Sequence, residues 1–174
     1  MNMRTALKSE DTEQINVIQW AQWNTQKYPE LKWLYHCPNG GSRNRLEAVK
    51  LKQMGVKAGV SDLHLPYPKG IYHGLYIEMK YGNNKQQDTQ KEFLSDMAAA
   101  GHYVVTCYSA EEAIKILQEY CELRDSADKT YMQSSRISGR QYKTQMSIAN
   151  NSILKDGKIT KPKLASEKTS VPVE

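Results

Sequence analysis

The chain has 174 residues, 39% of them hydrophobic, and a formal net charge of +5. This length suits one domain with a sizeable core plus an extension, and the basic balance suggests a polyanionic partner. No apolar run reaches the roughly 18 residues of a membrane span, and the N-terminus lacks an apolar secretion signal, so we expect a cytoplasmic protein with no membrane partner.

The predicted elements alternate between helices and strands. In chain order they are a helix over 11–27, a strand over 32–37, a helix over 42–54, strands over 62–65 and 75–80, a helix over 86–100, a strand over 102–108 and a helix over 109–123. Asp11 with Gln14, and Ser109 with Glu112, resemble capping boxes at the first and last helix. This order predicts an α/β domain over residues 9–124.

The C-terminal part of the chain differs in composition. Residues 1–128 hold 15 Lys and Arg against 16 Asp and Glu, whereas residues 129–174 hold 9 against 3. Beyond Arg124 the sequence is rich in Ser, Lys, Thr and Asn and has no sustained hydrophobic period. We therefore predict a basic, largely disordered tail over 125–174.

Two neighbouring strands alternate apolar and polar residues with a period of two. An antiparallel pairing that places Leu63 opposite Ile77 buries the apolar residues together. The same register puts Asp62 opposite Glu78 on the other face, with Lys80 two residues further along that face. A shift of one residue would bury the charges instead, so we expect this register.

Two carboxylates at cross-strand distance repel each other unless a cation lies between them, and such oxygen ligands favour Mg²⁺ or Mn²⁺. A lysine beside the ion can orient or deprotonate a water, or stabilise charge on a phosphate. These groups are what phosphodiester hydrolysis needs. On spacing alone, however, a solvated polar face of an amphipathic hairpin is the simpler interpretation, because an acid followed by E-x-K is a permissive pattern.

Wider context favours the catalytic interpretation. The stretches "GVKAGVSD" and "LYIEMK", followed by Gln90 ahead of "GHYVV" and "SAEEAIKIL", resemble the VRR-NUC (virus-type replication-repair nuclease) domain of the PD-(D/E)xK nucleases. The similarity runs from about Glu13 to Cys121. It implies a restriction-endonuclease-like α/β core in which a central mixed four-stranded sheet is flanked by helices, and it suggests a stand-alone phage-type member.

The resemblance also assigns residues to the site. The catalytic residues it implies are Asp62, Glu78, Lys80, Glu13 and Gln90. The metal ligands it implies are Asp62, Glu78, the Met79 carbonyl and Glu13.

Alternative interpretations exist for two of these residues, and one position departs from the family pattern. Glu13 can instead be an ordinary acid at a helix N-terminus, and Gln90 can be a solvated helix residue. Ser61 stands where the family motif has proline, which affects the stiffness of the approach to Asp62.

The expected substrate is DNA. The "NGGSRNR" stretch can hold phosphate through backbone amides, although an Asn-Gly turn before a helix is common without any ligand. The candidate DNA-contacting residues are Asn39, Arg43, Arg45 and Lys57. The resemblance implies a Mg²⁺-dependent endonuclease, with Mn²⁺ able to substitute, that acts on branched or four-way-junction DNA as a homodimer, like a Holliday-junction resolvase. The alternatives are a nicking or flap nuclease of phage replication or packaging, and a catalytically silent DNA-binding module.

Overall fold

The computed structural model describes residues 8–38, 45–124, 143 and 145–163. The helices are α1 (Glu10–Trp23), α2 (Arg45–Gln53), α3 (Asp88–Ala99) and α4 (Ala110–Cys121), with a 3-10 helix η1 (Pro29–Trp33). The strands are β1 (Tyr35–His36), β2 (Leu63–Leu65), β3 (Leu75–Met79), β4 (Tyr103–Cys107), β5 (Ser152–Lys155) and β6 (Lys158–Thr160). Within these ranges no helix is both long enough and apolar enough to cross a bilayer.

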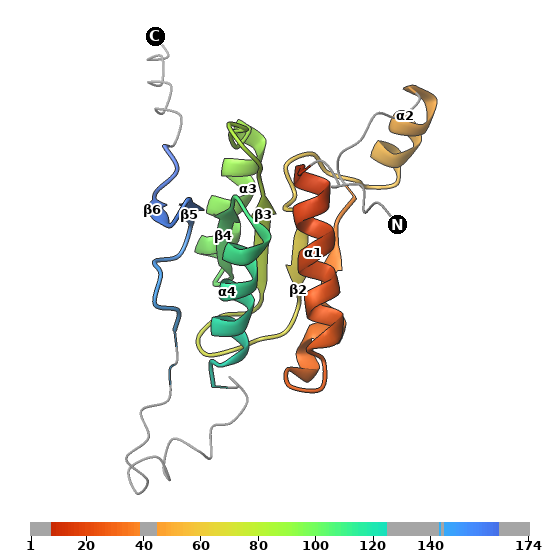
Figure 1. The fold of residues 1–174 in the computed structure, drawn as a ribbon. Coiled ribbons are helices and arrows are strands. Elements are labelled where there is room, and N and C mark those ends of the chain that lie inside the picture. Colours follow the sequence, from red (N-terminus) through yellow and green to blue (C-terminus); the bar gives the residue numbers. More distant parts are fainter. Residues whose placement is uncertain (1–7, 39–44, 125–142, 144, 164–174) are drawn as a thin grey trace, which may run out of the picture.

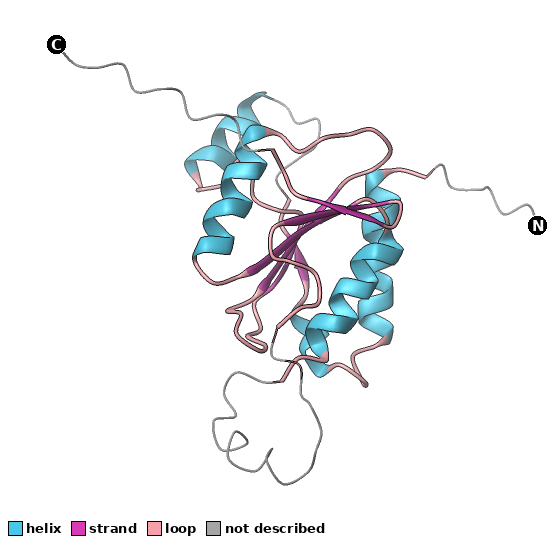
Figure 2. Ribbon diagram, turned by 90° about the vertical axis from the view of Figure 1, so that its left-hand side faces the viewer, coloured by secondary structure: helices cyan, strands magenta, loops and turns pink. Residues whose placement is uncertain are grey.

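The strands form one mixed sheet in the order β1-β2-β3-β4-β5-β6 (Figure 1). The β3–β4 and β4–β5 pairs are parallel and the other pairs are antiparallel. Leu63 pairs with Ile77 in β2–β3, which confirms the predicted register. Helices cover both faces of the sheet, so the predicted architecture is confirmed, with six strands rather than four (Figure 2).

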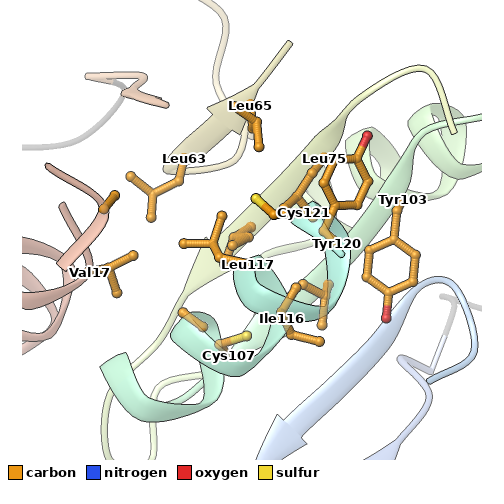
Figure 3. Close-up of a cluster of buried hydrophobic side chains, with 14 of the residues drawn as sticks. Val17, Leu63, Leu65, Leu75, Tyr103, Cys107, Ile116, Leu117, Tyr120 and Cys121 are labelled. Carbon is orange, nitrogen blue, oxygen red and sulfur yellow. The ribbon is translucent and has the colours of Figure 1, made fainter. Parts of the chain in front are cut away.

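The main hydrophobic core lies between the sheet and the helices α1 and α4, which pack against each other. Val17 of α1 and Leu117 of α4 are fully buried there against Leu63 and Ile77 of the sheet (Figure 3). The opposite face is covered by α3, whose Leu94 is also fully buried. Because side chains alternate along a strand, the charged residues of β3 face the α3 side.

The first helix is shorter than predicted. It begins at Glu10, because Ser9 accepts a hydrogen bond from the Thr12 backbone and forms the capping box that we had assigned to Asp11. It ends at Trp23, where the Asn24 side chain donates to the Trp20 carbonyl at 2.8 Å. The predicted strand over 32–37 is reduced to β1, since Lys32 and Trp33 still belong to η1 and only Tyr35 and His36 pair with β2.

The N-terminus of α4 begins where the sequence predicts. Ser109 accepts a hydrogen bond from the Glu112 backbone, as expected of its capping residue. The Glu112 carboxylate, however, accepts from the Tyr108 backbone at 2.9 Å rather than from Ser109, so only half of the predicted box forms.

The prediction of a largely disordered tail is wrong for β5 and β6, which extend the sheet beyond β4. Asp156 and Gly157 connect these strands with φ of 51° and 74°, as a tight hairpin turn requires. Leu154 faces the core, and the Asn150 side chain bonds to the backbone of Val104 and His102 on either side of the start of β4. Pairing with the open edge of β4 therefore orders a polar segment that has few apolar residues of its own.

Leu154→Ala is expected to lower the free energy of unfolding by about 2–5 kcal/mol, because it removes a core side chain that is 7% exposed. Urea denaturation measures the change. Ile159→Ala is the matched control, since Ile159 lies opposite Leu154 in β6 but is 57% exposed. Equal effects of the two substitutions would contradict the packing of β5 on the core.

Candidate active site

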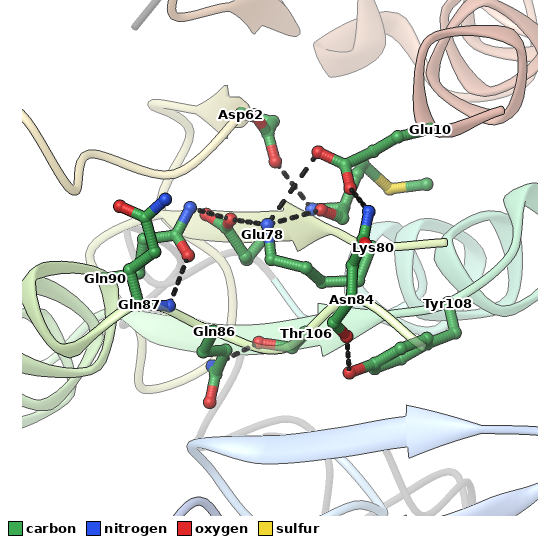
Figure 4. Close-up of polar contacts among 11 residues, drawn as sticks. Glu10, Asp62, Glu78, Lys80, Asn84, Gln86, Gln87, Gln90, Thr106 and Tyr108 are labelled. Atoms are coloured by element: carbon green, nitrogen blue, oxygen red, sulfur yellow. Dashed lines mark hydrogen bonds and ion pairs between the residues drawn. The ribbon is translucent and has the colours of Figure 1, made fainter. Parts of the chain in front are cut away.

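Asp62 and Glu78 meet on the α3 face of the sheet (Figure 4). Asp62 directly precedes β2, and Glu78 lies one residue beyond Ile77, the partner of Leu63. The Asp62 carboxylate accepts a hydrogen bond from the Met79 backbone N–H at 2.7 Å, which fixes it beside β3. The antiparallel register thus brings the two acids together from residues 16 positions apart in the sequence.

The Glu78 carboxylate is fully buried. Its Oε1 accepts hydrogen bonds from Lys80 Nζ, at 2.5 Å, and from Gln90 Nε2. Its Oε2 is buried and has no hydrogen-bond partner among the described residues. Burial, together with the negative charge of Asp62, raises the pKa of Glu78 to about 8, although Lys80 opposes this shift. A buried acceptor without a partner is costly, so this oxygen favours the approach of a cation.

Lys80 supplies the positive charge of the site. Burial lowers its pKa, but the charge and hydrogen bond of Glu78, together with the charges of Glu10 and Asp62, outweigh burial. The pKa of Lys80 therefore lies above its ordinary value, and the side chain is an ammonium at neutral pH. Its Nζ also donates to the Met79 carbonyl at 3.0 Å. Burial also raises the pKa of Asp62, against the opposing effects of the Met79 N–H and the Lys80 charge.

The donor set suits a hard divalent ion. The described residues contain no group of three or more His, Cys, Asp or Glu side chains arranged to hold a metal. Two carboxylates and a backbone carbonyl nevertheless converge here, from Asp62, Glu78 and Met79, and the Oε2 of Glu78 is an oxygen without a hydrogen-bond partner among the described residues. Oxygen-only sites with few protein ligands are typical of Mg²⁺, which keeps several waters.

Gln90 connects the carboxylate pair to α3. Its Nε2 donates to Glu78 Oε1, and its Oε1 accepts from the Gln87 backbone at 2.8 Å. The second bond belongs to a capping box at the start of α3. Gln90 therefore holds Glu78 in place while being held itself by the helix N-terminus.

The structure places Glu10, and not Glu13, beside Lys80. A Glu10 carboxylate oxygen lies 3.8 Å from Lys80 Nζ, and Glu10 lines the same pocket of about 480 Å³ as Asp62. The Glu13 carboxylate instead accepts from the Ala110 backbone N–H at 2.7 Å, at the N-terminus of α4. Glu13 thus stabilises the contact between two helices through a charge-assisted bond to a helix N-terminus.

Glu10→Gln is expected to slow DNA cleavage by roughly 10–100-fold, the effect typical of losing an outer partner of a metal site. Glu13→Gln, its matched control, is expected to leave the cleavage rate within a few-fold of wild type and to cost roughly 0.5–1 kcal/mol of stability, because it removes a charge at a helix N-terminus. Single-turnover rates and urea denaturation separate the two effects. A loss of cleavage rate in Glu13→Gln that is larger than in Glu10→Gln, with unchanged stability, would instead make Glu13 a residue of the active site.

Gly59 explains why the loop before Asp62 contains a glycine. Its φ is +85°, and an added Cβ would lie 2.5 Å from the Thr89 carbonyl oxygen in the first turn of α3. Only glycine permits this approach. The loop that leads to Asp62 is thereby packed against α3, the helix that contains Gln90. Ser61, in the same loop, is fully buried.

The candidate DNA-contacting residues are only partly covered by the structure. Asn39 and Arg43 lie outside the described residues, and for Arg45 only the backbone, at the start of α2, is described. Lys57 is exposed in the loop that leads to Gly59. Their contact with DNA stays a prediction.

Two residues of this region were not identified from the sequence. Asn84 Nδ2 donates to Glu10 at 3.5 Å, and the Asn84 carbonyl accepts from the Tyr108 hydroxyl at 2.6 Å. These two bonds tie the loop after β3 to the start of α1 and to the loop after β4. No sequence pattern indicated them, because both contacts join segments that are distant in the chain.

In the presence of a chelator, the free energy of unfolding is expected to fall as the pH rises from about 5 to about 8. The folded pKa of Glu78, about 8, lies above its ordinary value of 4.5, so the folded protein retains a proton that the unfolded chain releases in this window. This stabilisation is complete below the ordinary pKa and is lost as the pH rises through the folded pKa. Urea denaturation across this range should give a flatter profile for Glu78→Gln, and identical profiles would contradict the buried, protonated carboxylate.

Comparison with known proteins agrees with this geometry. Residues 4–111 match the VRR-NUC domain family. A solved structure described as a VRR_NUC domain protein is 35% identical and superposes with a TM-score of 0.58, covering 68% of this chain and 92% of its own. No curated protein matched the sequence. The family match ends before β5, so the β5–β6 hairpin lies beyond it.

The matched region contains Asp62, Glu78, Lys80 and Gln90, which the fold gathers around one pocket. Family membership implies a nuclease of the PD-(D/E)xK type, and the order of these residues along the chain is the one that motif describes. The chain therefore belongs to the VRR-NUC domain family of nucleases.

Proposed function

We propose that this protein is a divalent-metal-dependent endonuclease that hydrolyses phosphodiester bonds in DNA, with Mg²⁺ as its ion and Mn²⁺ as a substitute. The observation that carries the proposal is the buried Asp62–Glu78 pair, in which Glu78 keeps an unpartnered oxygen beside the ammonium of Lys80. The two carboxylates next to an open pocket can both be ionised at neutral pH only when a cation lies between them, and phosphate is an anionic ligand that such a cation attracts.

Asp62, Glu78 and the Met79 carbonyl are the groups that would hold the ion. When bound, the ion supplies Lewis-acid polarisation of the phosphate and lowers the pKa of water. The role of the protein groups is to orient these ligands: the Met79 N–H fixes Asp62, and Gln90 fixes Glu78. Each carboxylate is thus held in one position before substrate arrives, which avoids a reorganisation cost during the reaction.

Lys80 acts in this proposal as a charged hydrogen-bond donor rather than as a base. Its raised pKa keeps it protonated at the pH of catalysis, and its contact with Glu78 orients the ammonium at the pocket. An ammonium near the scissile phosphate stabilises the negative charge that builds up in the transition state. Of the roles open from the sequence, this one fits the electrostatics of the site best.

We extend the proposal to branched DNA, including four-way junctions, cleaved by a homodimer. The support is the resemblance to stand-alone VRR-NUC nucleases that act as junction resolvases. A nicking or flap nuclease uses the same chemistry and differs only in the DNA structure that it selects.

A substrate panel tests both levels of the proposal. End-labelled four-way junctions, flaps, nicked duplexes and linear duplexes of the same sequence are incubated with the protein and Mg²⁺, with and without chelator. Chelator-sensitive internal cuts are expected, with the junction cut fastest. DNA binding with no cleavage of any substrate would overturn the nuclease proposal in favour of a silent binding module, and equal rates on all substrates would overturn the preference for branches. Sedimentation of the free protein reports the dimer.

A further inference from the structure

The β5–β6 hairpin is attached to the loop that follows Lys80. Lys155 Nζ donates to the Gly82 carbonyl at 2.6 Å, lies 3.5 Å from Asn83 Oδ1 and sits 4.8 Å from the centroid of the Tyr108 ring. These contacts attach the hairpin, which pairs with β4, to the loop that follows Lys80. The hairpin thus forms the edge of the sheet beyond β4 (Figure 1).

One face of the hairpin lines a groove of about 660 Å³. The strand register pairs Ile153 with Thr160 and Lys155 with Lys158, and all four residues line this groove. Lys85 lines both this groove and the pocket that contains Asp62 and Lys80. The groove and the catalytic pocket therefore adjoin at Lys85.

The groove is positively charged. Its lining contains Lys85, Lys155 and Lys158 against a single acid, Asp156. Lys85 and Lys158 are exposed, and neither forms an ion pair with another described residue. Such lysines can contact a ligand without first breaking an internal bond.

Lys155 and Lys158 lie directly opposite each other across the two strands. Like charges in this position destabilise a hairpin unless something compensates. The carbonyl and ring contacts of Lys155 compensate part of the repulsion within the protein. Lys158 has no such contact among the described residues, so its charge remains available to an anion.

We propose that this groove binds the sugar-phosphate backbone of the DNA strand as it leaves the catalytic pocket, with Lys85 nearest the site and Lys158 further along. The inference rests on the proposed nuclease function and adds the path of the substrate. An extended polyanion matches a line of lysines that begins beside the carboxylate pair, and phosphate contacts of this kind set position without reading sequence. Lys161, exposed just after β6, continues the line.

Binding experiments without metal test the groove independently of cleavage. Fluorescence anisotropy with a labelled duplex and a four-way junction, in chelator and at 50–200 mM salt, compares wild type with Lys85→Gln, Lys158→Gln and the double variant. The matched control is Lys27→Gln, because Lys27 is exposed beyond the C-terminal end of α1, opposite the end that carries Glu10. Each lost phosphate contact should reduce the slope of log affinity against log salt by about 0.9 on duplex DNA. A single variant's deficit should then shrink by roughly threefold across this salt range.

In Lys158→Gln, the DNA concentration needed for the half-maximal cleavage rate should rise. If the variants bind DNA with wild-type affinity, and their plots of log affinity against log salt are parallel to that of wild type, the proposal that the groove binds DNA is wrong. If the groove variants bind DNA more weakly but the wild-type protein cuts no substrate, the groove is supported and the nuclease proposal is overturned. The two failures are therefore distinguishable. Urea denaturation of each variant confirms that the hairpin is still folded.

Discussion

Glu78→Gln is expected to reduce the rate of Mg²⁺-dependent DNA cleavage by about 10³-fold, corresponding to a loss of roughly 4 kcal/mol of transition-state stabilisation. The substitution keeps the shape of the side chain and leaves an oxygen for Gln90 and Lys80. It removes the anionic charge, and with it the unpartnered oxygen that favours a cation. Single-turnover cleavage measures the rate, and titration with Mn²⁺ measures the metal affinity, which should fall as well.

The fold should survive this substitution, because in the metal-free protein a carboxylate whose pKa is raised to about 8 keeps its proton at neutral pH and is uncharged, as glutamine is. The anionic form that the substitution removes is the one that a bound cation would stabilise. Circular dichroism and urea denaturation at pH 7 check this point. Glu111→Gln is the control, since Glu111 lies in α4 with its side chain 82% exposed. This variant should cleave DNA at the wild-type rate. A Glu78→Gln protein that cuts DNA as fast as this control would remove Glu78 from the active site.

Lys80→Met is expected to lower the cleavage rate at saturating DNA by about 10²–10³-fold, similar to the loss of one preorganised donor in other active sites. Methionine keeps the apolar stem of a side chain that is 5% exposed but lacks the ammonium. DNA affinity should change little, because the proposed contact is made chiefly in the transition state. Cleavage rates and anisotropy titrations, measured on the same substrate, separate catalysis from binding.

The Lys80 variant also distinguishes a charged donor from a base. If Lys80 deprotonated water, the wild-type rate would depend on the fraction of neutral lysine and would rise steeply at high pH. Because the pKa of Lys80 lies above its ordinary value, the ammonium form persists at high pH. The cleavage rates of wild type and of Lys80→Met should therefore depend on pH in the same way. Weaker DNA binding at an unchanged maximal rate would instead make Lys80 a phosphate anchor.

The local pattern was sufficient to predict the pairing of β2 and β3. Because side chains alternate along a strand, only one register buries Leu63 with Ile77 and leaves Asp62 and Glu78 together on the other face. The cap at Ser109 was equally predictable, since it depends on residues three positions apart. The acid pair and its lysine therefore followed from the sequence.

The sequence did not distinguish Glu10 from Glu13. The two residues are three positions apart in one helix, so they project from nearby directions on its surface. Glu13 meets the N-terminus of α4, and Glu10 meets Lys80, only because α1 and α4 pack side by side over the sheet. A contact between elements nearly 100 residues apart cannot be derived from the local helical pattern.

The sequence by itself determined the order of the four helices and of β2, β3 and β4, the register of the acidic strand pair and the cluster of Asp62, Glu78 and Lys80, because each depends on short-range periodicity or spacing. It did not indicate η1, and it predicted a longer strand in place of β1. Tertiary structure decided the fate of the tail. The alternation around Asp156 and Gly157 is a hairpin signal, but its strands are short and mostly polar, and an isolated hairpin is marginally stable in water. The open edge of β4 supplies the missing backbone partners, and only this long-range pairing brings Lys158 to a groove that adjoins the catalytic pocket.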